Sequence, residues 1–189
     1  MNEFKMVDLI LGKQKQTLVG NGKKTSEFKT FPLALQQLIR LYSQKGGNIL
    51  VSGAYLASDL CEGEHLKRDD RLFIENVLKY KFRTSKASVS GSVKIVNSPN
   101  RFFKKNNISY YDEPNDISYY IESPDGIEAV GEGGFTICRY TENNISAAVA
   151  YSGKYKTCAF GFPFETIKSE KDRNKIMESV LLFLSLIHI

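Results

Sequence analysis

The sequence is poor in the residues that most often mark metal sites and disulfide-rich folds. Its three cysteines, Cys61, Cys138 and Cys158, form an odd set without a closely spaced pair, which excludes a disulfide framework and a zinc ribbon. Only two histidines occur, His65 and His188, and neither a zinc-protease nor an EF-hand spacing is present. We therefore expect no metal site.

Long runs of basic residues are also missing. The net charge is +5, but the lysines are spread along the whole chain. Nucleic-acid binding requires a stripe of Lys and Arg on one face, so we interpret these residues as a solvated surface and expect no nucleic-acid partner. The apolar run 6–11 is too short for a membrane span or a signal peptide. The sequence thus predicts no membrane insertion, and a chain that is either cytosolic or an internal piece of a longer protein.

Phosphate-binding loops are absent as well. The glycine-rich stretches 20–22 and 131–134 match neither G-x-G-x-x-G nor a loop that ends in G-K-[ST]. We interpret both stretches as turns and expect no cofactor.

The composition that remains is that of one folded domain over residues 1–189, with 42% hydrophobic and 25% charged residues. The apolar runs 6–11 and 48–52 each end at a glycine, which is typical of strands buried on both faces. Helical spacing predicts a first helix whose buried face is Leu35, Leu38, Ile39 and Tyr42. It also predicts a helix over about 69–79 and a last helix from Ser169, whose buried face is Ile176, Met177, Val180, Leu181 and Leu184.

The segment from about 84 to 151 has a different character, because polar and β-branched residues dominate it and turn signals interrupt it. It predicts short strands at 92–96, 117–122, 135–140 and 147–151. A last apolar strand follows at 155–160. Alternating strands and helices favour a three-layer α/β fold with a mainly parallel sheet, in which 84–151 is a β-rich insertion.

A binding site is expected beyond the carboxyl ends of the parallel strands, where ligands bind in open sheets of this kind. Polar side chains follow three strand ends and would face one crevice there: Lys13, Gln14, Ser52, Tyr55, Asp59 and Glu165. The alternative is that Ser52 and Asp59 cap a turn and a helix, and that Glu165 favours a helix N-terminus by its charge.

Catalytic candidates in this crevice are Ser52, His65 and Glu165, as nucleophile, base and acid. Ser52 lacks the flanking glycines of G-x-S-x-G, and His65 lies in a polar loop. Cys61 with His65 four residues later is a second pair, which would require a low thiol pKa. A different chemistry is offered by aromatic pairs, because exposed aromatic rings can form a platform for sugars; the pairs are Tyr110-Tyr111, Tyr119-Tyr120 and Phe102-Phe103. The alternative is that one residue of each pair points into the core and the other points out.

Three stretches of the chain resemble a known domain. They are 46–54 (GGNILVSGA) with Asp59-Leu60, 153–156 leading into 161–167 (GFPFETI), and Asp172-Arg173. Together they resemble a domain of large secreted bacterial proteins described as xanthan lyase-like or golvesin-associated. The resemblance covers about residues 6–184. It implies a flavodoxin-like fold similar to that of class I glutamine amidotransferases.

In the amidotransferase family, a cysteine nucleophile follows the strand after the first helix. That position falls on Ala54 here, and no histidine precedes Glu165. The resemblance therefore implies a non-catalytic accessory or glycan-binding domain of an extracellular or cell-surface protein that processes carbohydrate or cell wall. Its expected partners are a polysaccharide and neighbouring domains of the same polypeptide.

Two other functions stay open from the sequence. One is a hydrolase or polysaccharide lyase that acts through the crevice, and the other is a cytosolic small-ligand-binding domain. The chain is expected to be a fragment of a longer protein, and the tail Ser185 to Ile189 resembles a translated adapter rather than native sequence.

Overall fold

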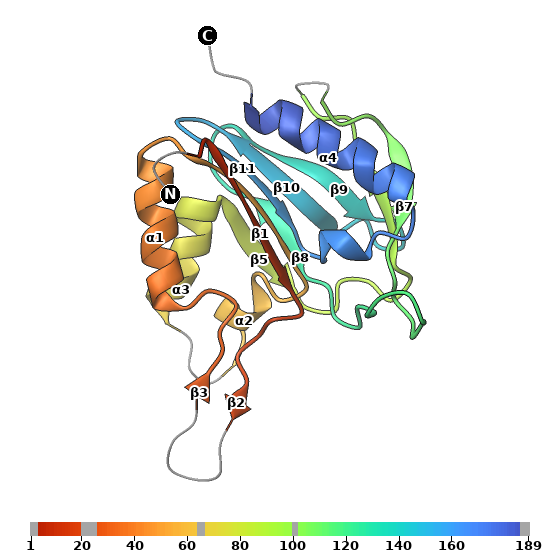
Figure 1. Ribbon diagram of the computed structural model, residues 1–189, viewed down its shortest axis with the longest axis horizontal. Helices are drawn as coiled ribbons and strands as arrows, with labels where there is room; N and C mark the ends of the chain where they lie inside the picture. The colour runs from red at the N-terminus through yellow and green to blue at the C-terminus, as the bar shows by residue number, and fades with distance from the viewer. Residues whose placement is uncertain (1–3, 20–25, 64–66, 100–101, 186–189) are drawn as a thin grey trace.

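The computed structural model describes residues 4–19, 26–63, 67–99 and 102–185. Its centre is a seven-stranded sheet (Figure 1). In spatial order the strands are β1 (Met6–Gly12), β4 (Asn48–Gly53), β11 (Lys156–Phe160), β10 (Ser146–Ser152), β9 (Gly134–Tyr140), β6 (Ser92–Ile95) and β7 (Asn106–Ser109).

The sheet is mixed and mostly antiparallel, so the predicted three-layer α/β fold with a mainly parallel sheet is wrong. Only β1 with β4 and β4 with β11 pair in parallel, whereas the other four pairs are antiparallel. The reason lies in the connections. Residues 141–145 join β9 to β10, and residues 153–155 join β10 to β11. Parallel neighbours need a crossover of about a dozen residues, so links this short force antiparallel pairing.

The segment 84–151 is therefore not an insertion. It supplies β6, β7, β9 and β10, which are four of the seven strands of the main sheet. Two small sheets accompany it, β2 (Leu18–Val19) with β3 (Ser26–Glu27), and β5 (Tyr80–Thr84) with β8 (Gly126–Ala129). The strand predicted at 117–122 does not form. Those residues belong to an irregular segment, 111–125, which we call the crevice loop.

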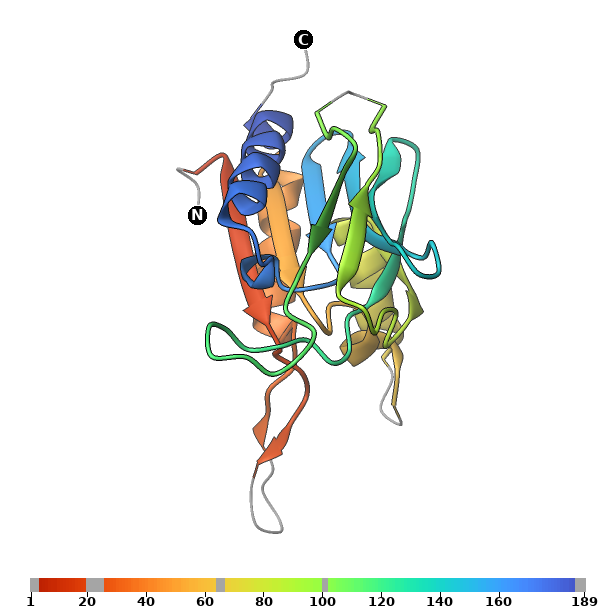
Figure 2. The same cartoon turned by 90° about the vertical axis from the view of Figure 1, so that its right-hand side faces the viewer.

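Helices cover both faces of the strands at the β1 side of the sheet (Figures 1 and 2). α4 (Glu170–Ser185) packs on one face, together with the short η2 turn (Phe164–Thr166). The other face carries α1 (Leu33–Gln44), α2 (Ser58–Cys61), α3 (Arg68–Phe73) and the π-helical turn η1 (Ile74–Leu78). No helix in the described ranges is long and apolar enough to cross a bilayer.

The core consists of two clusters, one on each face of the sheet. Along β4, Leu50 packs toward α4, whereas Ile49 and Val51 pack toward α1. This alternation follows from the two-residue period of a strand. Each such side chain, once fully buried, contributes about 1.5–3 kcal/mol. Leu38 and Leu181 were predicted to lie on buried helix faces but are not part of the core: Leu38 is 48% exposed and Leu181 is 41% exposed.

Candidate functional site

The carboxyl ends of β1, β4 and β11 lie side by side, because these strands are consecutive in the sheet and parallel. The crevice loop passes beside the end of β1 (Figure 2). Gly12 permits this approach: its φ is +54°, and a Cβ there would lie 3.1 Å from the hydroxyl of Tyr119. The resulting surface between the strand ends and the loop is the crevice described below.

Lys13 ties the end of β1 to the crevice loop. Its Nζ lies 2.5 Å from Glu122 Oε2 and 3.2 Å from the carbonyl oxygen of Tyr120, and 5.0 Å from the centre of the Tyr120 ring. The hydroxyl of Tyr55 donates to the other carboxylate oxygen of Glu122 at 3.2 Å. Partial desolvation raises the pKa of Glu122, but its hydrogen bond and charge contact with Lys13, a backbone hydrogen bond and the hydrogen bond from Tyr55 together lower it more, so the net shift is downward. Glu122 is therefore an ionised partner that orients both side chains.

The pKa of Tyr55 is raised to about 12, first because burial disfavours the phenolate and then because Glu122 is negative. Tyr55 is thus a neutral hydrogen-bond donor at neutral pH.

A second group lies where η2 meets β1. The hydroxyl of Tyr119 donates to Glu165 Oε1. The other oxygen, Oε2, is buried and has no hydrogen-bond partner among the described residues. The pKa of Asp8, on β1, is raised mainly by desolvation and in addition by the negative charge of Glu165. Two acids and a tyrosine hydroxyl are therefore placed close together, with one acceptor still unpaired.

Ser52 is a buried residue of strand β4. It pairs with Ile10 and Phe160 in the sheet and is 1% exposed. Among the described residues its hydroxyl has no hydrogen-bond partner. It therefore has no base in contact, which a serine nucleophile requires.

The other positions considered for catalysis are His65, Ala54 and Cys61. His65 and His188 lie outside the described residues. Ala54, at the position that the resemblance gives to the nucleophile, is fully buried, and its N–H donates to the carbonyl of Gly12 at 2.8 Å. Burial raises the pKa of Cys61 to about 11, which disfavours the reactive thiolate.

Gln14 and Asp59 brace the loop that follows β1. Gln14 donates from Nε2 to the carbonyl of Lys29 at 2.7 Å. Both oxygens of Asp59 accept backbone N–H groups, from Gln16 at 2.6 Å and from Thr30 at 2.8 Å. These contacts use the amide nitrogen of Gln14 and both carboxylate oxygens of Asp59 to hold the loop. The structure thus places Lys13, Tyr55 and Glu165 on the crevice, whereas Gln14 and Asp59 hold its rim.

Replacing Asp59 by Ala is expected to destabilise the protein by about 1–2 kcal/mol, because two backbone N–H groups lose their acceptor. Urea unfolding followed by circular dichroism measures this change. Asp69→Ala is the control, since Asp69 is exposed at the start of α3, and it should change the midpoint little. Equal midpoints for the two variants would contradict the bracing role of Asp59.

A hollow of about 520 Å³ adjoins the crevice on the other side of Glu165. The aromatic rings of Tyr111 and Phe164 line it, together with Lys168 and Arg173. Lys168 Nζ pairs with Asp112 at 3.1 Å. Glu165 therefore contacts Tyr119 of the crevice loop and also lines this hollow.

Sequence reasoning missed Asp8 and Glu122 as parts of this site. Asp8 had a signal, since it is the one charged residue in the apolar run 6–11. Glu122 had none, because a crevice loop without regular structure brings it to Lys13 over 109 residues of chain. In the described part of the chain, no three His, Cys, Asp or Glu side chains are grouped to hold a metal ion.

Fold and crevice together define a mixed α/β domain with a polar, tyrosine-lined surface at the ends of its parallel strands. No protein-family model matches the chain, and no curated protein matches its sequence. Among solved structures, the mmIFT52 N-terminal domain superposes with a TM-score of 0.50 and 16% identity, over 84% of this chain and 75% of that one.

The exo-beta-1,4-mannosidase Op5Man5 from Opitutaceae bacterium strain TAV5 superposes with a TM-score of 0.52 and 9% identity. That match covers 100% of this chain but 26% of the mannosidase, so the chain spans about a quarter of that enzyme's length. At these identities, both likenesses show the fold alone.

Proposed function

We propose that the chain is a non-catalytic glycan-binding domain, an accessory module of an extracellular bacterial protein of the xanthan lyase-like kind. The crevice is its binding surface. The observation that carries the proposal is the pairing of exposed tyrosine rings with an unpaired buried acceptor at Glu165.

The rings come from the crevice loop. Tyr119 is 40% and Tyr120 is 37% exposed, whereas the neighbouring Tyr110 is fully buried. A sugar ring has an apolar face of C–H groups that packs on an aromatic ring, and its hydroxyls need hydrogen-bond partners. Tyr120 is held in place by Lys13, so its ring is ordered before binding, which lowers the entropic cost.

The hydrogen-bond partners are mostly acceptors. The charge of Glu165 acts on the carboxyl of Asp8, and Glu165 Oε2 lacks a donor among the described residues. A buried oxygen without a donor is unfavourable by about 1–3 kcal/mol, and a ligand hydroxyl would remove that penalty. The chemistry of these residues therefore suits a neutral, hydroxyl-rich ligand.

The absence of catalysis is part of the proposal, and the surroundings of three described residues support it. Ala54 carries no reactive group, Ser52 contacts no base, and Tyr55 stays protonated at neutral pH.

Affinity gel electrophoresis with xanthan and other soluble polysaccharides tests the proposal. The wild-type chain should be retarded by at least one of them. Tyr120→Ala should weaken binding by about tenfold or more, since a central aromatic anchor is lost. Tyr119→Phe should weaken it less, because the ring remains and only the hydroxyl bound to Glu165 is removed.

Phe4→Ala is the matched control. Phe4 is 72% exposed but precedes β1, at the opposite end of the strand from the crevice. Unchanged wild-type mobility in every gel would refute glycan binding. Turnover of a polysaccharide or an ester that Glu165→Gln abolishes would favour a hydrolase or lyase instead. A rise in melting temperature with one free metabolite, without retardation, would favour a small-ligand-binding domain.

A further inference from the structure

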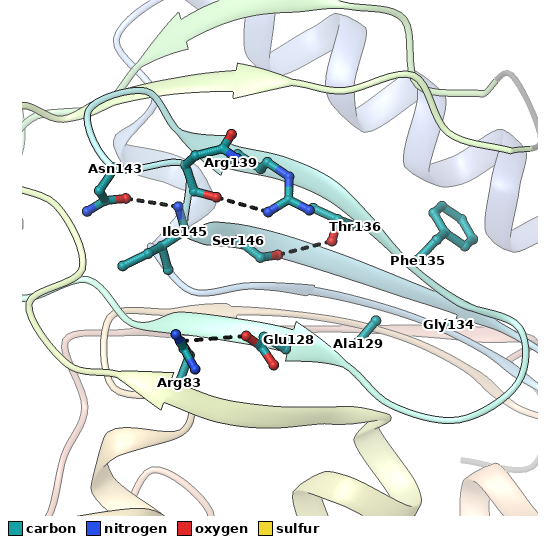
Figure 3. A pocket seen from close by; sticks show the side chains of 11 residues that line it. Arg83, Glu128, Ala129, Gly134, Phe135, Thr136, Arg139, Asn143, Ile145 and Ser146 are labelled. Carbon is teal, nitrogen blue, oxygen red and sulfur yellow. Dashed lines mark hydrogen bonds and ion pairs between the residues drawn. The ribbon is translucent and has the colours of Figure 1, made fainter.

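A hollow of about 460 Å³ opens between the small β5–β8 sheet and strands β9 and β10 of the main sheet (Figure 3). Arg83 and Glu128 line one wall, and Thr136, Arg139 and Ser146 line the other. We call it the β8–β9 pocket; it shares no residue with the crevice. Sites for small molecules usually measure about 300–1,000 Å³, so it has room for a molecule the size of a monosaccharide.

Two hydroxyl groups face the β8–β9 pocket next to an irregularity in the sheet. The pairing of β9 with β10 shifts register between Ser146 and Ala148 and again between Ala148 and Val149. Such bulges re-aim side chains and are frequent beside binding sites. Ser146 is only 5% exposed, yet its hydroxyl lies 3.4 Å from Thr136 Oγ1 (Figure 3), which is long for an O–H···O bond. A ligand atom bonded to Ser146 would give this hydroxyl a shorter hydrogen bond than the one to Thr136.

Cations outnumber acids around the pocket. Lys81 Nζ lies 3.1 Å from Glu128 Oε2, whereas Arg83 Nε stays 3.6 Å from Glu128 Oε1, beyond hydrogen-bond distance. The one carboxylate is therefore engaged mainly by Lys81. The charge of Arg83 is left less well neutralised beside the pocket.

Arg139 supplies the second cation. Its guanidinium donates one N–H to the carbonyl of Asn144 at 2.9 Å, and this is the one side-chain hydrogen bond that Arg139 makes to the described residues. A guanidinium has five N–H donors in a planar fork, so several stay available. The contact with Asn144 holds the guanidinium on the same wall as the hydroxyls of Ser146 and Thr136 (Figure 3).

We propose that the β8–β9 pocket binds a small hydroxylated molecule that carries an oxyanion, either a carboxylate or a phosphate group. Arg139 and Arg83 bind the oxyanion, since guanidinium groups match its planar pairs of oxygens. Ser146 and Thr136 bind neighbouring oxygens of the same ligand. The proposal does not rest on glycan binding at the crevice, because the two sites use different residues.

Chemical-shift titration of the ¹⁵N-labelled full chain tests this site with three probes: sodium glucuronate, glucose 6-phosphate and neutral glucose. Either anion should shift the amides of Thr136, Arg139 and Ser146 saturably, more weakly at high salt, and glucose should not. The anion that binds more tightly identifies the carboxylate or the phosphate as the preferred group. The absence of saturable shifts with both anions, or equal binding of glucose, would overturn the proposal.

Arg139→Ala should weaken binding of the preferred anion by about tenfold or more, because a charge-assisted hydrogen bond is lost. Arg83→Ala should also weaken it and leaves the Asn144 turn untouched, which guards against local unfolding in the first variant. Arg71→Ala is the matched control: this arginine is exposed, pairs with Glu75, does not line the β8–β9 pocket and should keep wild-type affinity. Full affinity in both Arg139→Ala and Arg83→Ala would overturn the assignment.

Discussion

Lowering the pH from about 8 to about 5 is expected to raise the contribution of one buried carboxyl, Asp125, to folding stability by about 3 kcal/mol. Burial raises the pKa of Asp125 from 3.8 to about 7 in the folded state, although its two backbone hydrogen bonds act in the opposite direction. A folded-state pKa above the unfolded value means that the folded protein holds its proton more tightly. The stabilisation is therefore complete below about pH 4 and is lost as the pH rises through about 7.

The position of Asp125 explains this shift. The residue is fully buried, and its Oδ2 accepts the N–H groups of Ala57 and Ser58 at 2.7 and 2.9 Å. Its Oδ1 has no partner among the described residues. An ionised carboxylate there is held by two donors but lacks compensation on its other oxygen, so the neutral form is favoured.

The variant Asp125→Asn isolates the contribution of Asp125 to the pH dependence of stability from the contributions of the other titrating groups. Asparagine keeps the acceptor for Ala57 and Ser58 but carries no charge, so the variant should match wild type near pH 4 and exceed its stability near pH 8. Guanidinium unfolding of both proteins at a series of pH values measures the difference. Parallel stability curves for wild type and Asp125→Asn would contradict the raised pKa.

Phe183→Ala is expected to cost about 3–5 kcal/mol, which is typical of deleting a fully buried aromatic ring. The ring of Phe183, on α4, is fully buried, with the rings of Phe102, Phe103 and Phe135 between 5.7 and 6.2 Å away, centre to centre. The ammonium of Lys156 lies 5.1 Å from the Phe183 ring and donates to the Phe183 carbonyl at 2.8 Å. The side chain thus joins α4 to β9, β11 and the segment before β7, and its loss leaves a cavity.

The neighbouring residue provides the control. Leu182 is 50% exposed, so Leu182→Ala should change stability by less than about 0.5 kcal/mol. Denaturant unfolding of both variants compares them directly. Similar losses for Phe183→Ala and Leu182→Ala would show that α4 is not held by this ring.

Much of the secondary structure could be predicted from local patterns. The runs 6–11, 48–52 and 155–160 form β1, β4 and β11, and the helix expected over 69–79 forms as α3 and η1. Strand direction could not be obtained from the apolar runs, since a strand buried on both faces has the same composition in parallel and antiparallel sheets. The short connection 153–155 did indicate that the strands on either side of it are antiparallel, because it is too short for the crossover that parallel neighbours need.

The helix faces show a different limit. Leu38 has the correct helical spacing but is 48% exposed, whereas Phe183 was not expected in the core and is fully buried. Helical spacing identifies the apolar face of a helix. It does not show how far burial extends around that face, because this depends on the elements that pack against the helix.

The site was predictable only where it follows strand ends. Lys13, Tyr55 and Glu165 come next to strands β1, β4 and β11 and lie on the crevice. The contribution of Glu122 depends on the path of the crevice loop, which long-range contacts determine. The β8–β9 pocket had no local signal either, since it arises between strands that the sequence does not show to be neighbours.

β1 forms one edge of the main sheet, and in the described part of the chain nothing pairs with its outer side. A long apolar edge of this kind invites strand-to-strand association, and a charge in the middle of it is a common safeguard. Asp8 supplies that charge, but desolvation and Glu165 raise its pKa, so acid neutralises it sooner than an ordinary aspartate. Lowering the pH therefore has two opposite effects. Protonation of Asp125 increases the free energy of unfolding, whereas protonation of Asp8 removes the charge that opposes strand association at this edge and so promotes aggregation.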